Sequence, residues 1–107
     1  MTIESTIPSL IDNQALVYLR RRGEEVEFAE GDTVLRQGET GAAFWVILHG
    51  EVEVVLRSAE DADQSLLRLG PGETFGELAI LRSAPIAADV VAVTPVTLLR
   101  YPGEYLP

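Results

Sequence analysis

The chain has 107 residues, which is enough for one domain of modest size. Apolar residues make up 47% of it and charged residues 23%, a balance typical of a folded domain rather than a disordered chain. Eight basic and 17 acidic residues give a net charge of −9, which argues against sequence-independent binding to nucleic acid. With no cysteine and one histidine, disulfide scaffolds, zinc–thiolate sites and multi-histidine metal sites are excluded.

Membrane-spanning helices and signal peptides have recognisable sequence patterns. No apolar run approaches the roughly 20 residues that a membrane-spanning helix needs. The N-terminal segment Met1–Thr6 lacks the basic and apolar regions of a signal peptide. On this absence of signals alone, we expect a cytoplasmic protein without a membrane partner.

The first predicted element is a helix over residues 8–22. Leu10, Leu16 and Leu19 recur near helical spacing, and Gly23 follows as a residue that commonly ends helices. Three consecutive arginines, Arg20–Arg22, fall in the last turn, where the helix dipole favours cations. We interpret them as a solvated helix end rather than as a site for an anionic partner.

From residue 24 to residue 101, short apolar runs alternate with glycine-containing turns. Runs of this length and spacing predict an all-β sandwich or barrel. The predicted strands are 26–28, 33–36, 44–48, 52–57, 66–69, 89–93 and 97–101. Phe44 and Trp45 are adjacent in one of them, so one is expected to face the core and the other to face outward.

The acidic, apolar-poor stretch 58–64 predicts an exposed hairpin loop. Its acids, Asp61 and Asp63, and the pair Glu24 and Glu25 have no neighbouring base or nucleophile in the sequence. We therefore expect them to serve solubility rather than acid–base catalysis.

One segment interrupts the β pattern. Glu77–Leu81 consists of good helix formers, follows Gly76 directly and ends before Pro85, which predicts a short helix between two strands. The unpaired amides at the start of such a helix suit an anionic oxygen. Gly76 would let the backbone approach a ligand closely, because glycine has no side chain.

Three motifs carry a resemblance to a known family. They are Glu30-Gly31-Asp32 with Leu35–Gly41, then Leu69–Ala79 with its Phe-Gly-Glu-Leu-Ala sequence, and then Ala84–Val90. In these motifs the chain resembles the cyclic-nucleotide-binding domain family, from about Leu10 to Tyr101. The resemblance implies a mainly β fold, an eight-stranded β-roll or jelly roll (a double-stranded β-helix), with an N-terminal helix and a short helix in a phosphate-binding cassette.

The resemblance also implies the domain organisation and the site. It implies a single domain over residues 1–107, with the helix at 8–22, the β-roll at 24–101 and a truncated C-terminal helix region at 102–107. The implied ligand-binding residues are Phe75, Gly76, Glu77, Leu78, Ala79, Ile86, Ala87 and Ala88. In the family, the residue at the position of Glu77 accepts a hydrogen bond from a ribose hydroxyl. From the residues alone, a carboxylate that stabilises its own helix start is an equal alternative.

The cassette departs from the family pattern at residue 86. The family usually has an arginine here, which neutralises the cyclic phosphate, and a threonine three residues later. This chain has Ile86 and Asp89 at these positions. Removing one partner of a buried charge pair costs about 3–5 kcal/mol, or roughly a hundred- to several-thousand-fold in affinity. Arg36 and Arg82 are the candidate replacements for the missing cation.

We therefore expect a non-enzymatic regulatory or sensor domain with weakened or lost cyclic nucleotide binding, which acts as an interaction or allosteric module of a larger protein. One alternative is a functional regulatory domain that binds cyclic AMP or cyclic GMP. The second is the sensor domain of a transcription regulator that lacks its DNA-binding part. No cofactor is expected apart from the cyclic nucleotide that Ile86 places in doubt. The expected partners are other domains or a partner protein, and no nucleic acid is expected to bind this chain alone.

Overall fold

The computed structural model describes residues 23–102 of the chain. The helix predicted at 8–22 and residues 103–107 of the predicted C-terminal region lie outside the described residues. The described elements are β1 (Glu24–Phe28), β2 (Thr33–Leu35), β3 (Ala43–His49), β4 (Val52–Leu56), β5 (Gln64–Leu69), β6 (Thr74–Phe75), α2 (Glu77–Leu81), β7 (Asp89–Ala92) and β8 (Val96–Pro102). Seven strands follow the predicted runs with ends shifted by one or two residues, and α2 has its predicted bounds. β6 was not predicted, because two residues carry too little pattern.

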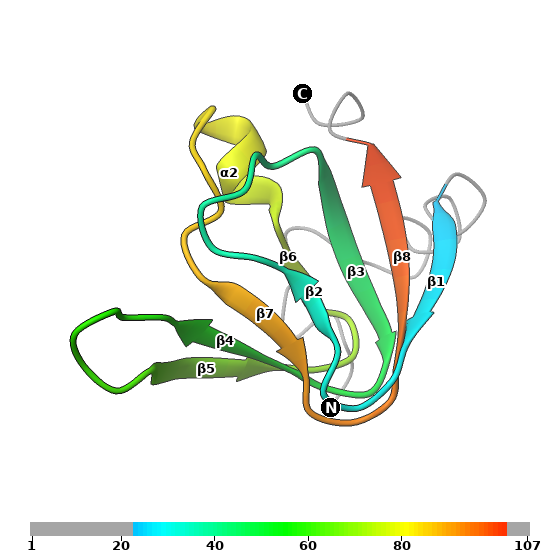
Figure 1. Ribbon diagram of the computed structural model, residues 1–107. Coiled ribbons are helices and arrows are strands. Elements are labelled where there is room, and N and C mark those ends of the chain that lie inside the picture. The colour runs from blue at the N-terminus through cyan, green and yellow to red at the C-terminus, as the bar shows by residue number, and fades with distance from the viewer. Residues whose placement is uncertain (1–22, 103–107) are drawn as a thin grey trace.

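The strands form two four-stranded sheets that face each other (Figure 1). The first sheet has the order β1-β8-β3-β6 and the second has the order β2-β7-β4-β5. All strand pairs are antiparallel. The mainly β jelly-roll fold expected from the sequence is therefore confirmed.

The main hydrophobic core lies between the two sheets. Alternate residues of β3, Ala43, Trp45 and Ile47, face this core together with residues of β4, β6, β7 and β8. Trp45 packs parallel to Phe75 with their ring centres 6.1 Å apart. Each large apolar side chain buried in this way contributes about 1.5–3 kcal/mol. The core thus fixes the position of β6, which leads directly into α2.

The opposite face of β3 is buried as well. Phe44 and Val46 form a second cluster with Leu99 and Tyr101 of β8, and the rings of Phe44 and Tyr101 stack 4.9 Å apart. Phe44 is 8% exposed and Trp45 is 7% exposed. The prediction that one of these two neighbours faces outward is therefore wrong. Alternation along a strand assigns the two side chains to opposite faces, but it does not reveal that both faces are covered.

The β4–β5 hairpin extends away from the rest of the molecule (Figure 1). β5 is an edge strand of the second sheet, and five of its six residues are exposed. The loop between the two strands is exposed, as the sequence predicts. Val54, Leu56 and Leu66 of this hairpin form one wall of the site described next.

Candidate functional site

A cavity of about 470 Å³ lies beside α2 and the segment that follows it. All eight predicted site residues, from β6, α2 and the stretch 86–88, line this cavity. The other lining residues are Leu35, Val54, Leu56, Leu66, Thr74, Arg82, Ala84, Pro85 and Val90. Sequence reasoning missed the strand residues among them, because their presence depends on how β2, β4, β5 and β7 pair. The structure thus brings the predicted residues together in one place, and their ligand contacts stay a prediction.

The start of α2 depends on Gly76. This residue precedes the helix with a φ of 88°, in the left-handed region that favours glycine. A Cβ atom here would lie 3.0 Å from the carbonyl oxygen of Ala43 and 3.3 Å from Cδ1 of Trp45. The packing of the fold therefore explains why this position is a glycine, since Gly76 lets the chain turn closely over β3. It also lines the cavity.

Glu77 lines the cavity and lies in the first turn of α2. A negative charge is favourable there because of the helix dipole. However, no side chain makes a capping hydrogen bond at this helix start, and Glu77 Oε2 is buried with no partner among the described residues. A buried acceptor without a donor costs about 1–3 kcal/mol. This oxygen is closed off from solvent, so it is an unsatisfied acceptor inside the wall and not a group exposed in the cavity.

Ile86 is an apolar residue of the cavity wall, in contrast to the charged Glu77. Its side chain is 6% exposed and lines the cavity. Its backbone N–H donates to the carbonyl of Glu39 at 2.8 Å, and its carbonyl accepts from the N–H of Gly38 at 2.8 Å. The two bonds fix the segment after α2 to the loop between β2 and β3. The isoleucine is therefore held in the wall, and an apolar group stands where the resemblance implies a cation.

The two candidate replacement cations differ in position. Arg82 caps the C-terminal end of α2 and lines the cavity, and it is exposed to solvent. Arg36 follows β2 and is not among the residues that line the cavity. Glu77 and Arg82 are thus the charged residues of the lining.

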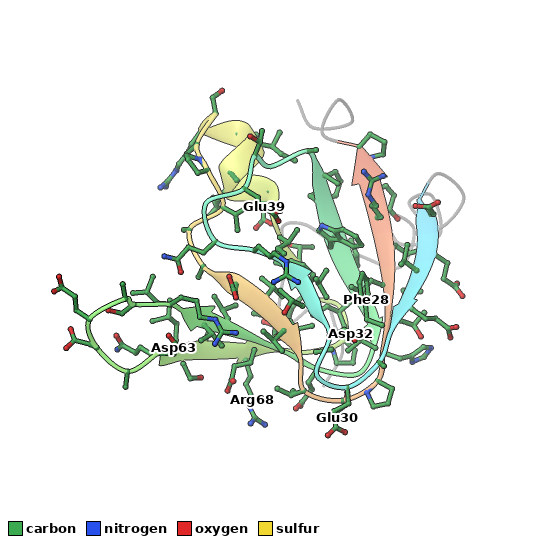
Figure 2. The ribbon with its side chains drawn as sticks, viewed as in Figure 1. Phe28, Glu30, Asp32, Glu39, Asp63 and Arg68 are labelled. Carbon is green, nitrogen blue, oxygen red and sulfur yellow. The ribbon has the colours of Figure 1, made fainter. Side chains whose placement is uncertain are left out.

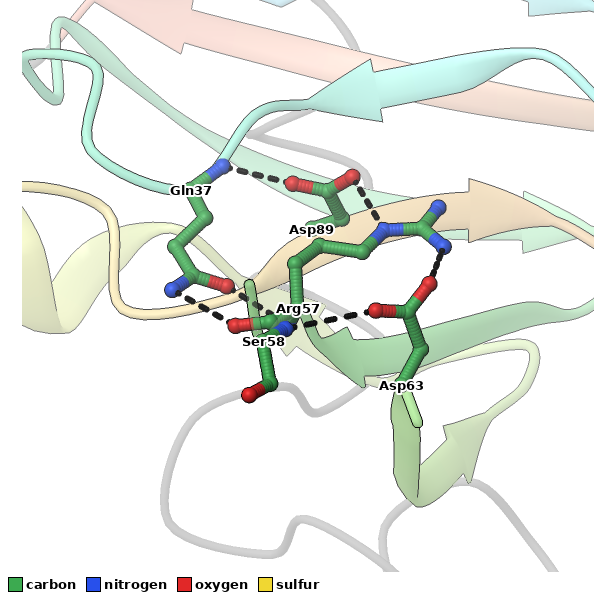
Figure 3. A network of polar contacts seen from close by, with 5 residues as sticks. All are labelled: Gln37, Arg57, Ser58, Asp63 and Asp89. Atoms are coloured by element: carbon green, nitrogen blue, oxygen red, sulfur yellow. Dashed lines mark hydrogen bonds and ion pairs between the residues drawn. The ribbon is translucent and has the colours of Figure 1, made fainter. Parts of the chain in front are cut away.

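A network of polar contacts lies beside the cavity wall and holds Asp89 (Figure 3). Asp89 Oδ1 accepts a hydrogen bond from the backbone N–H of Gln37 at 2.7 Å, and Oδ2 accepts one from Arg57 Nε at 2.8 Å. Arg57 Nη1 also donates to Asp63 Oδ2 at 2.7 Å. The Gln37 side chain closes the network, because its Oε1 accepts from the backbone N–H of Arg57 at 2.8 Å.

The network corrects two expectations. Asp89 is not part of the cavity lining, so its charge is held by its own partners and does not face a ligand. The Gln37 N–H and the Arg57 guanidinium both hold the pKa of Asp89 below its usual value. Asp63 is exposed as expected, yet it is more than a solubility residue, because Arg57 binds it and lowers its pKa. Both carboxylates in turn raise the pKa of Arg57, Asp89 more strongly.

Residues 25–106 match the family model described as cyclic nucleotide-binding domain. This match covers most of the chain, and the chain belongs to the cyclic nucleotide-binding domain family. A cAMP-dependent protein kinase regulatory subunit from Mucor circinelloides f. lusitanicus is 44% identical over 69 residues, which are 64% of this chain and 16% of that protein. A CRP-like cAMP-activated global transcriptional regulator from Mycobacterium tuberculosis is 29% identical over 86 residues, which are 80% of this chain and 38% of that protein.

Solved structures show the same relationship. The regulatory subunit of a cAMP-independent protein kinase A from Trypanosoma brucei superposes with a TM-score of 0.79 at 33% identity, over 95% of this chain and 38% of that one. A variant of that protein with glutamate-to-alanine, threonine-to-arginine and valine-to-alanine substitutions is bound to cAMP in the A site. The chain spans less than two fifths of the length of each of these relatives.

The helix and the acidic side chains within residues 23–102 also bear on membrane and metal binding. No helix in this part of the chain has the length and apolar character needed to cross a membrane. No group of three or more histidine, cysteine, aspartate or glutamate side chains in this part is placed to hold a metal ion.

Proposed function

We propose that this chain is a non-enzymatic regulatory domain whose site binds cyclic AMP and cyclic GMP weakly or not at all. In this proposal it acts as an interaction or allosteric module of a larger protein. The observation that carries the proposal is the buried side chain of Ile86 in the cavity wall. A cyclic phosphate placed against it would lose its hydration and gain no counter-charge.

Arg82 does not compensate for the missing cation in this proposal. Its side chain is exposed at the end of α2, where water screens its charge. An exposed ion pair contributes about 0–1 kcal/mol, whereas losing one partner of a buried pair costs about 3–5 kcal/mol. The difference of about 2–5 kcal/mol makes cyclic nucleotide binding roughly thirtyfold to several-thousand-fold weaker than in a site with a buried arginine.

The comparison structures connect cAMP binding with three substitutions, one of which introduces an arginine. The Trypanosoma brucei protein is described as belonging to a cAMP-independent kinase, and its cAMP-bound variant carries a new arginine among three substitutions. This chain shares 33% identity and the fold with that protein. We infer that Ile86 has the same consequence here, namely a site of the family's shape without affinity for the anion.

The role in a larger protein rests on the relatives. The matched proteins are described as a kinase regulatory subunit and a transcriptional regulator, and this chain matches only a part of each. A functional cyclic nucleotide-binding domain is the second candidate, and the retained cavity with Glu77 in its lining favours it. A sensor domain of a transcription regulator also fits, given the match to the Mycobacterium tuberculosis protein.

Titration calorimetry of the chain with cyclic AMP and cyclic GMP tests this function. We expect dissociation constants in the millimolar range or weaker for the natural sequence. Ile86→Arg should strengthen cyclic AMP binding at least about tenfold, because it supplies a guanidinium inside the cavity. Ala62→Arg is the matched control, since it adds the same charge at an exposed loop position outside the cavity lining and should change binding little.

Two outcomes would contradict the proposal. One is micromolar binding of cyclic AMP to the natural sequence, and its loss in Arg82→Ala would identify Arg82 as the cation. The other is an equal gain from Ile86→Arg and Ala62→Arg, which would show that the added charge matters but its position does not. Thermal unfolding of each variant establishes that it is folded.

A further inference from the structure

We propose that the cavity is a preformed site for a small, uncharged, apolar ligand, which it holds by packing rather than by hydrogen bonds. This inference rests on the proposed function, because it takes the cavity to have lost its affinity for a cyclic phosphate. It adds the chemical class of ligand that the cavity accepts, and it identifies Arg57 as a positioning residue of the cavity wall.

The interior of the cavity is apolar. Most of its lining residues are leucine, valine, alanine, proline, phenylalanine or isoleucine. Of the charged lining residues that the structure describes, Glu77 has its Oε2 closed off inside the wall, and Arg82 is exposed to solvent. Water in such a cavity finds few hydrogen-bond partners, so an apolar ligand displaces it readily. A ligand with a charge or several polar groups would lose hydration there and gain little in return.

Polar contacts outside the cavity hold its walls in place. The backbone of Ile86 makes two hydrogen bonds with the loop between β2 and β3. The lining residue Leu56 is followed by Arg57, whose Nε donates to Asp89 Oδ2 at 2.8 Å (Figure 3). Asp89 comes directly after the lining residue Ala88. The hairpin wall and the wall after α2 are thus fixed relative to each other, which keeps open an apolar surface that a ligand can cover.

The volume and the rim of the cavity define the ligand further. The volume of about 470 Å³ lies within the range of small-molecule sites in proteins. Leu56 and Leu66 from the β4–β5 hairpin and Leu78 from α2 line the cavity and are 37%, 47% and 56% exposed. A compact ring compound that contacts these leucines would remove their apolar surface from water, which is favourable.

N-phenyl-1-naphthylamine and 1-anilinonaphthalene-8-sulfonate are matched probes, because the second has the same rings with one added sulfonate. In fluorescence titrations of the whole chain, we expect saturable binding of the uncharged probe and at least about tenfold weaker binding of the sulfonate. Ile86→Arg should shift this preference at least about tenfold toward the sulfonate, because it places a cation among the apolar lining residues. Ala62→Arg, at an exposed position outside the lining, should leave the preference unchanged.

The role of Arg57 is tested against a second arginine of the same hairpin. Arg57→Met removes the contacts with Asp89 and Asp63, and it should weaken binding of the uncharged probe at least about fivefold, because the hairpin wall is no longer fixed. Arg57→Lys keeps the charge and should recover part of this affinity. Arg68→Met is the control, since Arg68 lies 3.6 Å from Glu53 and outside the lining. Equal losses in Arg57→Met and Arg68→Met would overturn the assignment of Arg57, and thermal unfolding establishes that each variant is folded.

Competition separates this inference from the proposed function. Displacement of the uncharged probe by millimolar adenosine or cyclic AMP overturns the inference, and displacement by micromolar cyclic AMP overturns the proposed function as well. The inference alone is overturned if the uncharged probe shows no saturable binding, or if the sulfonate binds the natural chain more tightly. A probe affinity that falls as the protein concentration rises would show that a second copy of the chain covers the cavity, which also overturns the inference.

Discussion

Asp89 shows how one residue can look like part of a binding site and serve the fold instead. Asp89 is 8% exposed, and its two carboxylate oxygens have separate partners, the Gln37 N–H and Arg57. Gln37 lies 52 positions away in the sequence and Arg57 lies 32 positions away. A charge that lies beside Ile86 and Ala88 in the sequence is thus directed away from the cavity. It ties together the loop after β2, the end of β4 and the start of β7.

At this scale we predict that Asp89→Asn destabilises the chain by about 1–3 kcal/mol at neutral pH, because an acceptor of the Gln37 N–H and of Arg57 loses its charge. The folded-state pKa of Asp89 is lowered. Its stabilising contribution is therefore present above the unfolded-state value of about 4 and is lost as the pH falls through the folded-state value. The free energies of unfolding of the two proteins should converge in acid.

Urea denaturation at several pH values measures this difference. Asp61→Asn is the control, because this exposed loop acid has no side-chain hydrogen bond or ion pair within the described residues. It should change the free energy of unfolding by less than about 0.5 kcal/mol. A difference between the natural protein and Asp89→Asn that does not shrink as the pH falls below the unfolded-state pKa of about 4 would refute this assignment.

At the scale of elements, the position of α2 depends on two glycines that let the chain pass closely. A Cβ at Gly41 would lie 2.8 Å from that of Ala79 in α2, and one at Gly76 would meet the backbone of Ala43. The loop before β3 and the turn before α2 therefore pack without side chains between them. The shape of the cavity follows from this packing, since α2 forms one of its walls.

We predict that Gly76→Ala lowers the free energy of unfolding by about 1–3 kcal/mol, because alanine is strained at a φ of 88° and close to the Ala43 carbonyl. Gly70→Ala is the matched control, since a Cβ there meets nothing within 4 Å and its φ lies outside the left-handed region. Urea denaturation of both variants provides the measurement. Equal effects of the two substitutions would show that the left-handed turn before α2 is not needed.

The sequence predicted where the strands and the helix lie better than it predicted which residues pack around them. Apolar runs and turn glycines located seven strands, and helix formers after Gly76 located α2. The cavity walls contributed by Leu56 and Leu66 were not predicted, because they depend on the pairing of β4 with β5 and on where the hairpin lies. The outward position expected for Phe44 or Trp45 was wrong for a similar reason. Local pattern reports a residue's own conformation, whereas burial and partners depend on segments far away in the chain.

At the scale of the whole molecule, three of the five arginines within residues 23–102 contact acidic or aromatic side chains. Arg57 binds Asp63 and Asp89, Arg68 lies 3.9 Å from Glu51 and 3.6 Å from Glu53, and Arg100 lies over the Trp45 ring at 6.0 Å. With a net charge of −9, these arginines do not form the basic face that a phosphate backbone requires. Figure 2 shows acidic side chains such as Glu30, Asp32 and Glu39 on the loops around the sheets.

We therefore predict that this chain alone does not retard duplex DNA in a mobility-shift assay at moderate salt. Lowering the salt concentration should not produce binding either, because residues 23–102 carry no concentrated positive charge and the net charge of the chain is −9. A DNA-binding protein run on the same gel serves as the positive control. A retarded band that disappears as salt is added would contradict the prediction.

The pairing of β1 with β8 has a consequence for how the protein is made. β1 is paired along its whole length with β8, from Glu24 opposite Arg100 to Phe28 opposite Val96. During translation β1 leaves the ribosome first, and its partner follows only after the segments between them, on the order of ten seconds later at common elongation rates. During this interval the backbone N–H and C=O groups of β1 lack their strand partner. Completion of the first sheet is thus a late event in biosynthesis, and chaperone occupancy on the ribosome is expected to fall only once β8 has emerged.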